Sequence, residues 1–207
     1  MNGSFYDLAM APLERRMLTP LRRRLWRELP GSGLGLEVGA GTGVNFVLHP
    51  PGARVVAIDA SCDMLRNARG RSKAAGTLLV ACDVEALPFR DGAFDWGAET
   101  LVFCELRRPE AALREIARVL AGGARWAMLD HVRPAGWLGG VADLFTRLSA
   151  PLWGEHFDRS PEPTLRDTGF AIHQRIPFGR GLLRLLVCAA PPAAGRAANR
   201  PQRASAV

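Results

Sequence analysis

The stretch Leu36-Glu37-Val38-Gly39-Ala40-Gly41-Thr42-Gly43 decides the fold of this chain. It joins a short apolar run, typical of a buried strand, to a turn with glycine at every second position. Because glycine has no Cβ, such a turn can bend tightly and bring its backbone close to a ligand. The spacing is neither the G-x-G-x-x-G fingerprint of dinucleotide-binding sheets nor that of a phosphate-binding loop, which ends in Lys and Ser or Thr. We therefore expect a strand, a ligand-binding turn and a helix here.

Apolar runs that predict strands alternate along the chain with segments that predict helices. The predicted strands cover residues 34–38, 54–58, 78–81, 94–102 and 124–129, and the predicted helices between them cover 62–73 and 109–120, the second ended by Gly122-Gly123. Such alternation predicts an α/β fold in which helices cover both faces of a parallel sheet. Residues 170–178 and 182–189 flank Gly179-Arg180-Gly181 and predict an antiparallel pair, which makes the sheet seven-stranded and mostly parallel.

The sequence predicts three parts, which are a helical lid at residues 1–32, the α/β domain at residues 33–190 and a disordered tail at residues 191–207. In the first part, large apolar residues recur near helical spacing among arginines, and Pro12 and Pro20 divide them into short helices. The tail is rich in Pro, Ala, Gly, Arg and Ser, a composition that does not form a packed core.

Composition and charge narrow the function classes. With 48% hydrophobic and 23% charged residues, the 207-residue chain is neither disordered nor fibrous. Its net charge of +7 is carried almost entirely by arginine, since Lys73 is the single lysine. This charge indicates either an anionic partner, such as nucleic acid or a phospholipid surface, or a general arginine bias.

Two further features bear on location and metal binding. No apolar run reaches the roughly 18–20 residues of a transmembrane helix, and we expect no signal peptide. The chain has four cysteines, Cys62, Cys82, Cys104 and Cys188, and their spacing is not that of metal ligands. They predict reduced thiols in a cytoplasmic protein that binds no metal.

Acidic residues follow the next two predicted strands. Asp59 lies twenty residues after Gly39, where a carboxylate can accept hydrogen bonds from both hydroxyls of a ribose. Asp83 follows the third strand. Because ligands bind outside the carboxyl ends of parallel strands, the glycine turn and the two carboxylates together predict a nucleotide-like cofactor site.

These motifs resemble the class I S-adenosylmethionine (SAM)-dependent methyltransferases. The resemblance covers about residues 33–133 and rests on E-V-G-x-G-T-G at 37–43, on Asp59, on Asp83-Val84-Glu85-x-Leu87-Pro88-Phe89 and on Phe94-Asp95. It implies a Rossmann-like fold and SAM as cofactor.

The resemblance also implies a role for particular residues. Gly39–Gly43 would face the amino-acid part of SAM, Asp59 would hold the ribose, and Asp83 would accept from the adenine amino group. Met64 would pack on the adenine or belong to the core, and Tyr6 would close over the cofactor or simply pack. The residues implied at the cofactor site are Glu37, Gly39, Gly41, Thr42, Gly43, Asn45, Asp59, Ala60, Met64, Asp83, Val84, Thr100 and Tyr6.

A narrower resemblance is to the small type 11 methyltransferases that methylate alkyl thiols, and to bacterial relatives that methylate phosphatidylethanolamine or quinone precursors. It rests on Gly41-Thr42-Gly43-x-Asn45-Phe46, Pro50-Pro51-Gly52, Thr100–Cys104, Asp130-His131-Val132 and His156-Phe157-Asp158-Arg159. The chain departs from that group at Asp130, where Glu is usual, and at Asp158, where Asn is usual. The resemblance implies a small lipophilic acceptor: a thiol, a phospholipid amine or a quinone precursor.

The predicted catalytic residues, His131 and Asp130, end the fifth predicted strand, with Cys104 and Glu105 expected at the same rim. A thiol or phenol acceptor must lose a proton, and an unperturbed histidine titrates near neutrality, so His131 is the best candidate base. The other interpretation is that His131 fixes the loop through a backbone hydrogen bond. The apolar N-terminal segment and residues 134–160 would roof an acceptor pocket.

Two alternative functions remain open at this point. The basic charge favours RNA or protein methylation, but the sequence has no N-P-P-Y motif and no RNA-binding module, so we expect no nucleic acid partner. A non-catalytic SAM-binding subunit is the other alternative. Residues 4–28 mix Leu, Met, Phe and Trp with Arg, which predicts either a lid or peripheral contact with the inner membrane surface. The sequence does not indicate the oligomeric state.

Overall fold

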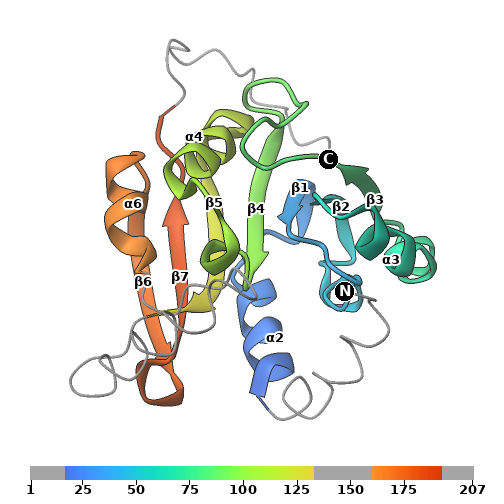
Figure 1. Ribbon diagram of the computed structural model, residues 1–207, viewed down its shortest axis with the longest axis horizontal. Coiled ribbons are helices and arrows are strands. Elements are labelled where there is room, and N and C mark those ends of the chain that lie inside the picture. Colours follow the sequence, from blue (N-terminus) through green and yellow to red (C-terminus); the bar gives the residue numbers. More distant parts are fainter. Residues whose placement is uncertain (1–16, 133–159, 193–207) are drawn as a thin grey trace, which may run out of the picture.

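A computed structural model of the chain describes residues 17–132 and 160–192. Seven of its strands form one sheet in the order β3-β2-β1-β4-β5-β7-β6 (Figure 1). These strands are β1 (Ser32–Val38), β2 (Gly52–Asp59), β3 (Leu78–Ala81), β4 (Phe94–Thr100), β5 (Leu120–His131), β6 (Ala171–Phe178) and β7 (Leu183–Ala189). β7 runs antiparallel to both of its neighbours, and the pairs among β1 to β5 are all parallel. The predicted seven-stranded, mostly parallel α/β fold is confirmed.

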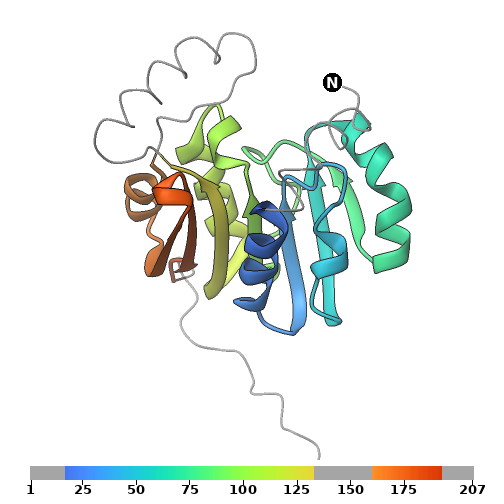
Figure 2. The same cartoon turned by 90° about the horizontal axis from the view of Figure 1, so that it is seen from below.

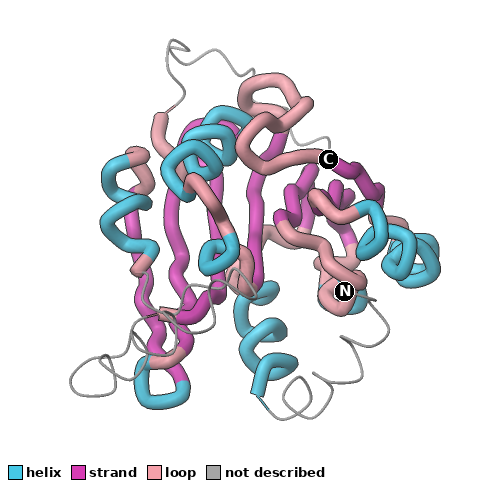
Figure 3. The backbone as a smooth tube through the Cα atoms, viewed as in Figure 1, coloured by secondary structure: helices cyan, strands magenta, loops and turns pink. Residues whose placement is uncertain are grey.

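Helices cover both faces of this sheet (Figure 2). They are α2 (Thr19–Arg27), α3 (Cys62–Ala75), α4 (Pro109–Val119) and α6 (Pro161–Asp167), with the short 3-10 turns η2 (Phe46–Leu48), η3 (Phe103–Glu105) and η4 (Gly179–Gly181). α4 and α6 pack on one face, and α2, α3 and η2 pack on the other. Figure 3 shows how the loops gather where strands and helices meet. In the described part of the chain, no helix is long and apolar enough to cross a membrane.

The two faces of β1 explain how the sheet is buried on both sides. Leu36 and Val38 pack toward α4, in a core that also contains Trp126. The intervening residue, Glu37, therefore projects to the face of α2, although it is charged. On that face Trp26 and Trp96 form a second core, with ring centroids 6.1 Å apart.

Two predicted boundaries are wrong, and each has a local cause. α4 ends at Val119 and β5 begins at once with Leu120, so Gly122-Gly123 lies inside the strand and does not end the helix. Both Val119 and Leu120 are buried, and Leu120 already pairs with β4. β4 ends two residues earlier than expected, at Thr100, because Leu101 has a left-handed backbone with φ of 59°.

The predicted lid at residues 1–32 is described only in part. Its described helix, α2, has Pro20 in the first turn, where the missing N–H costs no hydrogen bond. Pro20 therefore starts a helix at the place where the sequence predicts a break. Leu25 and Trp26 of α2 are buried against the sheet. Tyr6 and the rest of residues 1–16, residues 133–159 and residues 193–207 lie outside the described residues, so the lid and the tail stay predictions.

Candidate functional site

The turn after β1 has the left-handed backbone that its glycines predict. φ is 71° at Gly39, 53° at Gly41 and 81° at Gly43. A Cβ on Gly39 would lie 2.1 Å from Cγ2 of Val102, and one on Gly43 would lie 2.5 Å from the Phe46 ring. A Cβ on Gly41 would meet nothing within 4 Å. The outer two glycines are therefore required for packing, whereas Gly41 presents its backbone to open space.

Asp59, the last residue of β2, is bonded to this turn. Its Oδ2 accepts a hydrogen bond of 2.8 Å from the amide of Gly41, and its Oδ1 accepts one of 2.8 Å from Ser61. The side chain is half-buried. A carboxylate oxygen can accept a second hydrogen bond, so two ribose hydroxyls fit the remaining capacity. The structure thus brings Asp59 and Gly41 together at one edge of the sheet.

The start of α3 adjoins Asp59. Ser61 caps the helix by accepting a hydrogen bond of 3.3 Å from the amide of Met64. Ala60 is exposed, and Met64 is half-buried in the first turn of the helix. Met64 is therefore open to a ligand on part of its surface, as the prediction of an adenine contact requires.

Asp83 follows β3 on an adjacent loop. Its side chain is exposed, and Oδ1 accepts a hydrogen bond of 2.9 Å from the amide of Glu85, so Asp83 caps a turn. The half-buried Val84 lies next to it and packs against the core on the α4 side. The amide of Cys82 donates to the carbonyl of Asp59 at 3.2 Å, which ties the ends of β2 and β3 together.

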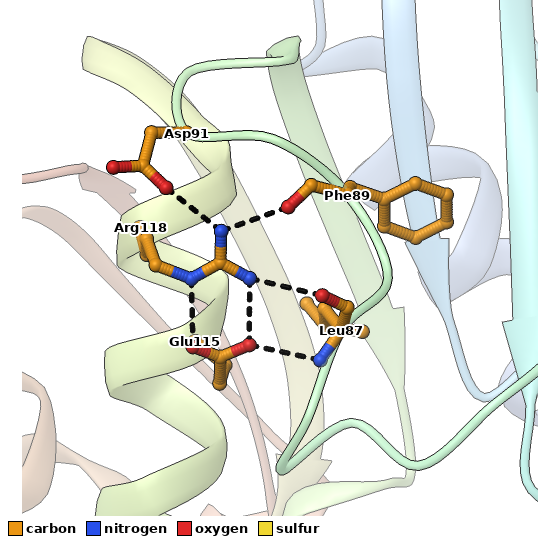
Figure 4. A network of polar contacts seen from close by, with 5 residues as sticks. All are labelled: Leu87, Phe89, Asp91, Glu115 and Arg118. Atoms are coloured by element: carbon orange, nitrogen blue, oxygen red, sulfur yellow. Dashed lines mark hydrogen bonds and ion pairs between the residues drawn. The ribbon is translucent and has the colours of Figure 1, made fainter.

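α4 fixes the loop that carries Asp83 (Figure 4). The guanidinium of Arg118 donates to the carbonyls of Leu87 and Phe89 at 2.9 and 2.8 Å. It also donates to both carboxylate oxygens of Glu115, one of which accepts from the amide of Leu87 at 2.8 Å. These bonds to Arg118 and Leu87 lower the pKa of Glu115. An ion pair on α4 thereby fixes the second half of the loop, in addition to the hydrogen bonds within the loop itself.

Three residues predicted to bind the cofactor, Glu37, Asn45 and Thr100, contact each other beneath the glycine turn. The carboxylate of Glu37 has no exposed surface and accepts a hydrogen bond of 2.7 Å from Nδ2 of Asn45. The same Nδ2 lies 2.9 Å from the hydroxyl of Thr100, at the end of β4. Thr42 is also buried, and its carbonyl accepts from Arg71 at 2.6 Å. These side chains support the turn from within the protein.

Asp130 and His131 project to opposite faces at the end of β5. Asp130 is buried, and its Oδ2 accepts a hydrogen bond of 2.6 Å from the amide of Phe103. Its Oδ1 accepts from the amide of His131 at 2.7 Å. Asp130 therefore anchors η3, and burial raises its pKa to about 6. His131 is half-buried on the α2 face, and burial lowers its pKa.

Sequence reasoning missed a second buried acid, Glu99, on β4 beside Asp130. Glu99 is buried, and its Oε1 has no hydrogen-bond partner among the described residues. Burial, and then the charge of Asp130, raise the pKa of Glu99 well above its usual range. The strand pattern gave no signal for it, because Glu99 occupies a buried position in a strand whose other buried residues are mostly apolar.

The backbone beside these acids is strained. Leu101 is the one residue other than glycine with a positive φ in the described ranges 17–132 and 160–192. Such a conformation costs on the order of 1–3 kcal/mol and is concentrated at functional sites. It places Val102 against Gly39. The strain therefore lies where the cofactor turn meets the predicted acceptor side.

The described residues offer no metal centre. Within ranges 17–132 and 160–192, no group of three or more His, Cys, Asp or Glu side chains is arranged to hold a metal ion. The described cysteines, Cys62, Cys82, Cys104 and Cys188, form no disulfide with one another, and Cys104 and Cys188 are buried.

Substitution of Glu99 by Gln should raise stability more at pH 8 than at pH 5. The folded-state pKa lies above the usual 4.5, so the folded protein keeps a proton that the unfolded chain releases. Stability contributed by this group is thus lost as the pH rises from about 4.5 through the folded-state pKa. Glu99→Gln removes that loss and preserves the shape of the side chain.

Urea unfolding of wild type and Glu99→Gln at both pH values measures the difference, with Glu105→Gln, on the exposed side of η3, as the control. A change in stability that is the same at pH 5 and pH 8, or a gain that is larger at pH 5, would contradict a raised pKa of Glu99.

Comparison with known proteins shows which proteins the chain is similar to. Residues 36–128 match the family described as a methyltransferase domain. A thiol S-methyltransferase from Homo sapiens is 36% identical over 133 residues, which are 61% of this chain and 53% of that protein. A phosphatidylethanolamine N-methyltransferase from Cereibacter sphaeroides is 28% identical over 183 residues, covering 86% of this chain and 88% of that protein. A demethylmenaquinone methyltransferase from Thermus thermophilus is 38% identical over 104 residues, which are 48% of this chain and 47% of that protein.

The chain thus spans about half the length of the human and Thermus relatives. Solved structures share its fold. A SAM-dependent methyltransferase from Thermotoga maritima has a TM-score of 0.69 at 21% identity, covering 90% of this chain and 95% of that one. One from Mesorhizobium loti has a TM-score of 0.65 at 19% identity, and the match covers 82% of this chain and 96% of that one. The family match over residues 36–128, on this fold and with this glycine turn, agrees with the resemblance found in the sequence: this part of the chain is similar to the methyltransferase domain family.

Proposed function

We propose that this protein is a SAM-dependent methyltransferase that methylates a small lipophilic acceptor. The observation that carries the proposal is the pairing of Asp59 with the open backbone of Gly41. This pairing offers hydrogen-bond acceptors for a ribose and an unobstructed backbone for the rest of the cofactor at one strand edge.

The residues present fit SAM. Asp59 would accept from the ribose hydroxyls, and Gly41 would lie along the amino-acid part. The second oxygen of Asp83 would accept from the adenine amino group, with Met64 against the ring. Glu37, Asn45 and Thr100 act from beneath the turn, because their polar atoms are bonded to one another.

SAM supplies a methyl group activated on a sulfonium, and the protein mainly aligns an acceptor for in-line displacement. On this chain His131 would take the proton of a thiol or phenol acceptor, and the lowered pKa keeps its imidazole neutral and able to do so at neutral pH. Asp130 is then a positioning residue, since its oxygens hold the amides of Phe103 and His131.

The surroundings of His131 favour an apolar acceptor. His131 pairs with Leu183 of β7, next to η4. A Cβ on Gly179 of η4 would lie 4.0 Å from Cβ of Leu182 and from Cε of Met17, so both side chains border this turn. They are 47% and 42% exposed, so two large apolar side chains lie together at the surface beside this turn.

The relatives act on acceptors of the same kind, since their names specify thiol, phosphatidylethanolamine and demethylmenaquinone methylation. We place the enzyme in the cytoplasm, where residues 4–28, rich in arginine and large apolar residues, allow peripheral contact with an anionic membrane surface. Such contact would give access to a lipid acceptor without a membrane-spanning segment. Apart from the net charge of +7, no observation on the described residues or their relatives favours RNA or protein methylation.

Substitution of Asp59 tests the cofactor site. Asp59→Ala should weaken SAM binding by roughly 1.5–3 kcal/mol, the scale of hydrogen bonds to a charged group. Asp59→Asn keeps one acceptor oxygen, so its loss of SAM affinity should be smaller than that of Asp59→Ala. Asp63→Asn, an exposed acid one helical turn further on, is the matched control. Calorimetry with SAM and S-adenosylhomocysteine measures the affinities, and no wild-type binding at millimolar concentration would refute the proposal.

Methyl transfer from labelled SAM tests the acceptor class. Purified protein is incubated separately with an alkyl thiol, phosphatidylethanolamine vesicles, a demethylated quinone precursor, RNA and a protein extract. We expect label in one of the first three and none in the others. Label mainly in RNA or protein would contradict the proposal of a small lipophilic acceptor. SAM binding without methyl transfer to any fraction would favour a non-catalytic SAM-binding subunit.

His131→Ala should slow single-turnover methylation of a thiol or phenol by about 10²–10⁴-fold and leave SAM affinity unchanged, because a general base acts on the acceptor only. The wild-type methylation rate should rise as the pH passes through the lowered pKa of His131. This rise should be absent from the pH profile of His131→Ala. His173→Ala, an exposed histidine on β6, is the control. Near-normal turnover of His131→Ala would show that the histidine is structural.

A further inference from the structure

Arg22 of α2 occupies a position where an apolar residue is expected. The buried residues of the segment recur at helical spacing, and they are Leu18, Arg22, Leu25, Trp26 and Leu29. Only 7% of the surface of Arg22 is exposed. Burying a guanidinium is costly unless it is hydrogen-bonded and its charge is balanced. Its partners therefore indicate what it does.

The guanidinium joins three separate parts of the fold. Its Nη1 donates to Oδ1 of Asn45 at 3.0 Å and also to the hydroxyl of Thr100. Asn45 follows the glycine turn by two residues, and Thr100 is the last residue of β4. One side chain of α2 thus reaches the cofactor turn and the end of the strand that leads to the acceptor side.

Asn45 connects this cation to a buried anion. Its Nδ2 donates to Oε1 of Glu37 at 2.7 Å, so both ends of the Asn45 amide are fixed. Oε2 of Glu37 lies 2.8 Å from Nε2 of His49, whose Nδ1 lies 3.0 Å from the hydroxyl of Thr77. We name this set, Arg22, Glu37, Asn45, His49, Thr77 and Thr100, the buried polar network.

The network links α2, β1, the residues on either side of η2, the end of β4 and Thr77 before β3. Without Arg22, the Asn45 oxygen and the Thr100 hydroxyl would each lose a buried donor. Unsatisfied buried groups of this kind favour rearrangement of the segment that carries them. That segment is the turn that holds Gly41.

We propose that Arg22 is a positioning residue for SAM binding, which sets the glycine turn against the end of β4 without touching the cofactor. The proposal rests on the proposed function for the identity of the ligand. A lysine would keep the charge but has no planar fork, so it can replace the guanidinium only in part. Because α2 lies within the predicted lid at residues 1–32, the same contact joins the described part of that segment to the cofactor turn.

Arg22→Met should raise the Kd for SAM about tenfold, the scale of one or two lost hydrogen bonds. Arg22→Lys should recover part of the loss. Arg23→Met, an exposed neighbour on the same helix, should bind SAM like wild type. Hydrogen exchange of the peptide covering residues 38–46 should be faster in Arg22→Met than in Arg23→Met, and this readout needs no cofactor.

Thr100→Val and Thr100→Ser keep the proposal testable if Arg22→Met does not fold. Val removes the hydroxyl that Arg22 bonds and should raise the Kd, whereas Ser retains it and should not. Unchanged SAM affinity and unchanged exchange in folded Arg22→Met, or in Thr100→Val where Arg22→Met does not fold, would overturn the proposal. Absence of SAM binding in wild type would contradict the proposed function instead, and the exchange comparison would still decide the role of Arg22.

Discussion

The buried carboxylate of Glu37 is the constraint on which the candidate site depends. It lies within a parallel strand, with no exposed surface, so every hydrogen bond to it must come from the protein. Asn45 and His49 supply these contacts, and both are reached only if the chain turns back directly after β1. The glycines, which have left-handed backbone angles, make that turn possible. The same turn brings the Gly41 amide within hydrogen-bond distance of the Asp59 carboxylate.

The edge of the sheet divides into two chemically different halves. The half at β1 to β3 presents polar groups that suit a nucleoside, with the loop of Asp83 held from behind by Arg118. The half at β4, β5 and β7 combines strained Leu101, buried acids and exposed apolar side chains near His131. A methyl donor and a lipophilic acceptor would thus meet above the end of β4, where the two halves join.

Much of this arrangement could be predicted from the sequence. Strand-helix alternation and acids at strand ends are local patterns, and they predicted the sheet and the proximity of Gly41 and Asp59. The end of α4 could not be predicted, because burial of Leu120 in the sheet outweighs the usual effect of Gly122-Gly123 as a helix stop. Arg22, His49 and Glu99 were missed because buried polar residues interrupt apolar patterns, and only their tertiary partners explain them.

Several residues near the site bond to other parts of the protein and so support the backbone of the site. Glu37, Asn45 and Asp130 all lie near the site, but their polar atoms bond to other parts of the protein. A crystal structure with S-adenosylhomocysteine is the most direct test of this cofactor site. We expect ribose hydroxyls within hydrogen-bond distance of the Asp59 carboxylate and the ligand lying against Gly41. A ligand bound elsewhere on the protein, or one that leaves Asp59 without a ribose contact, would contradict this expectation.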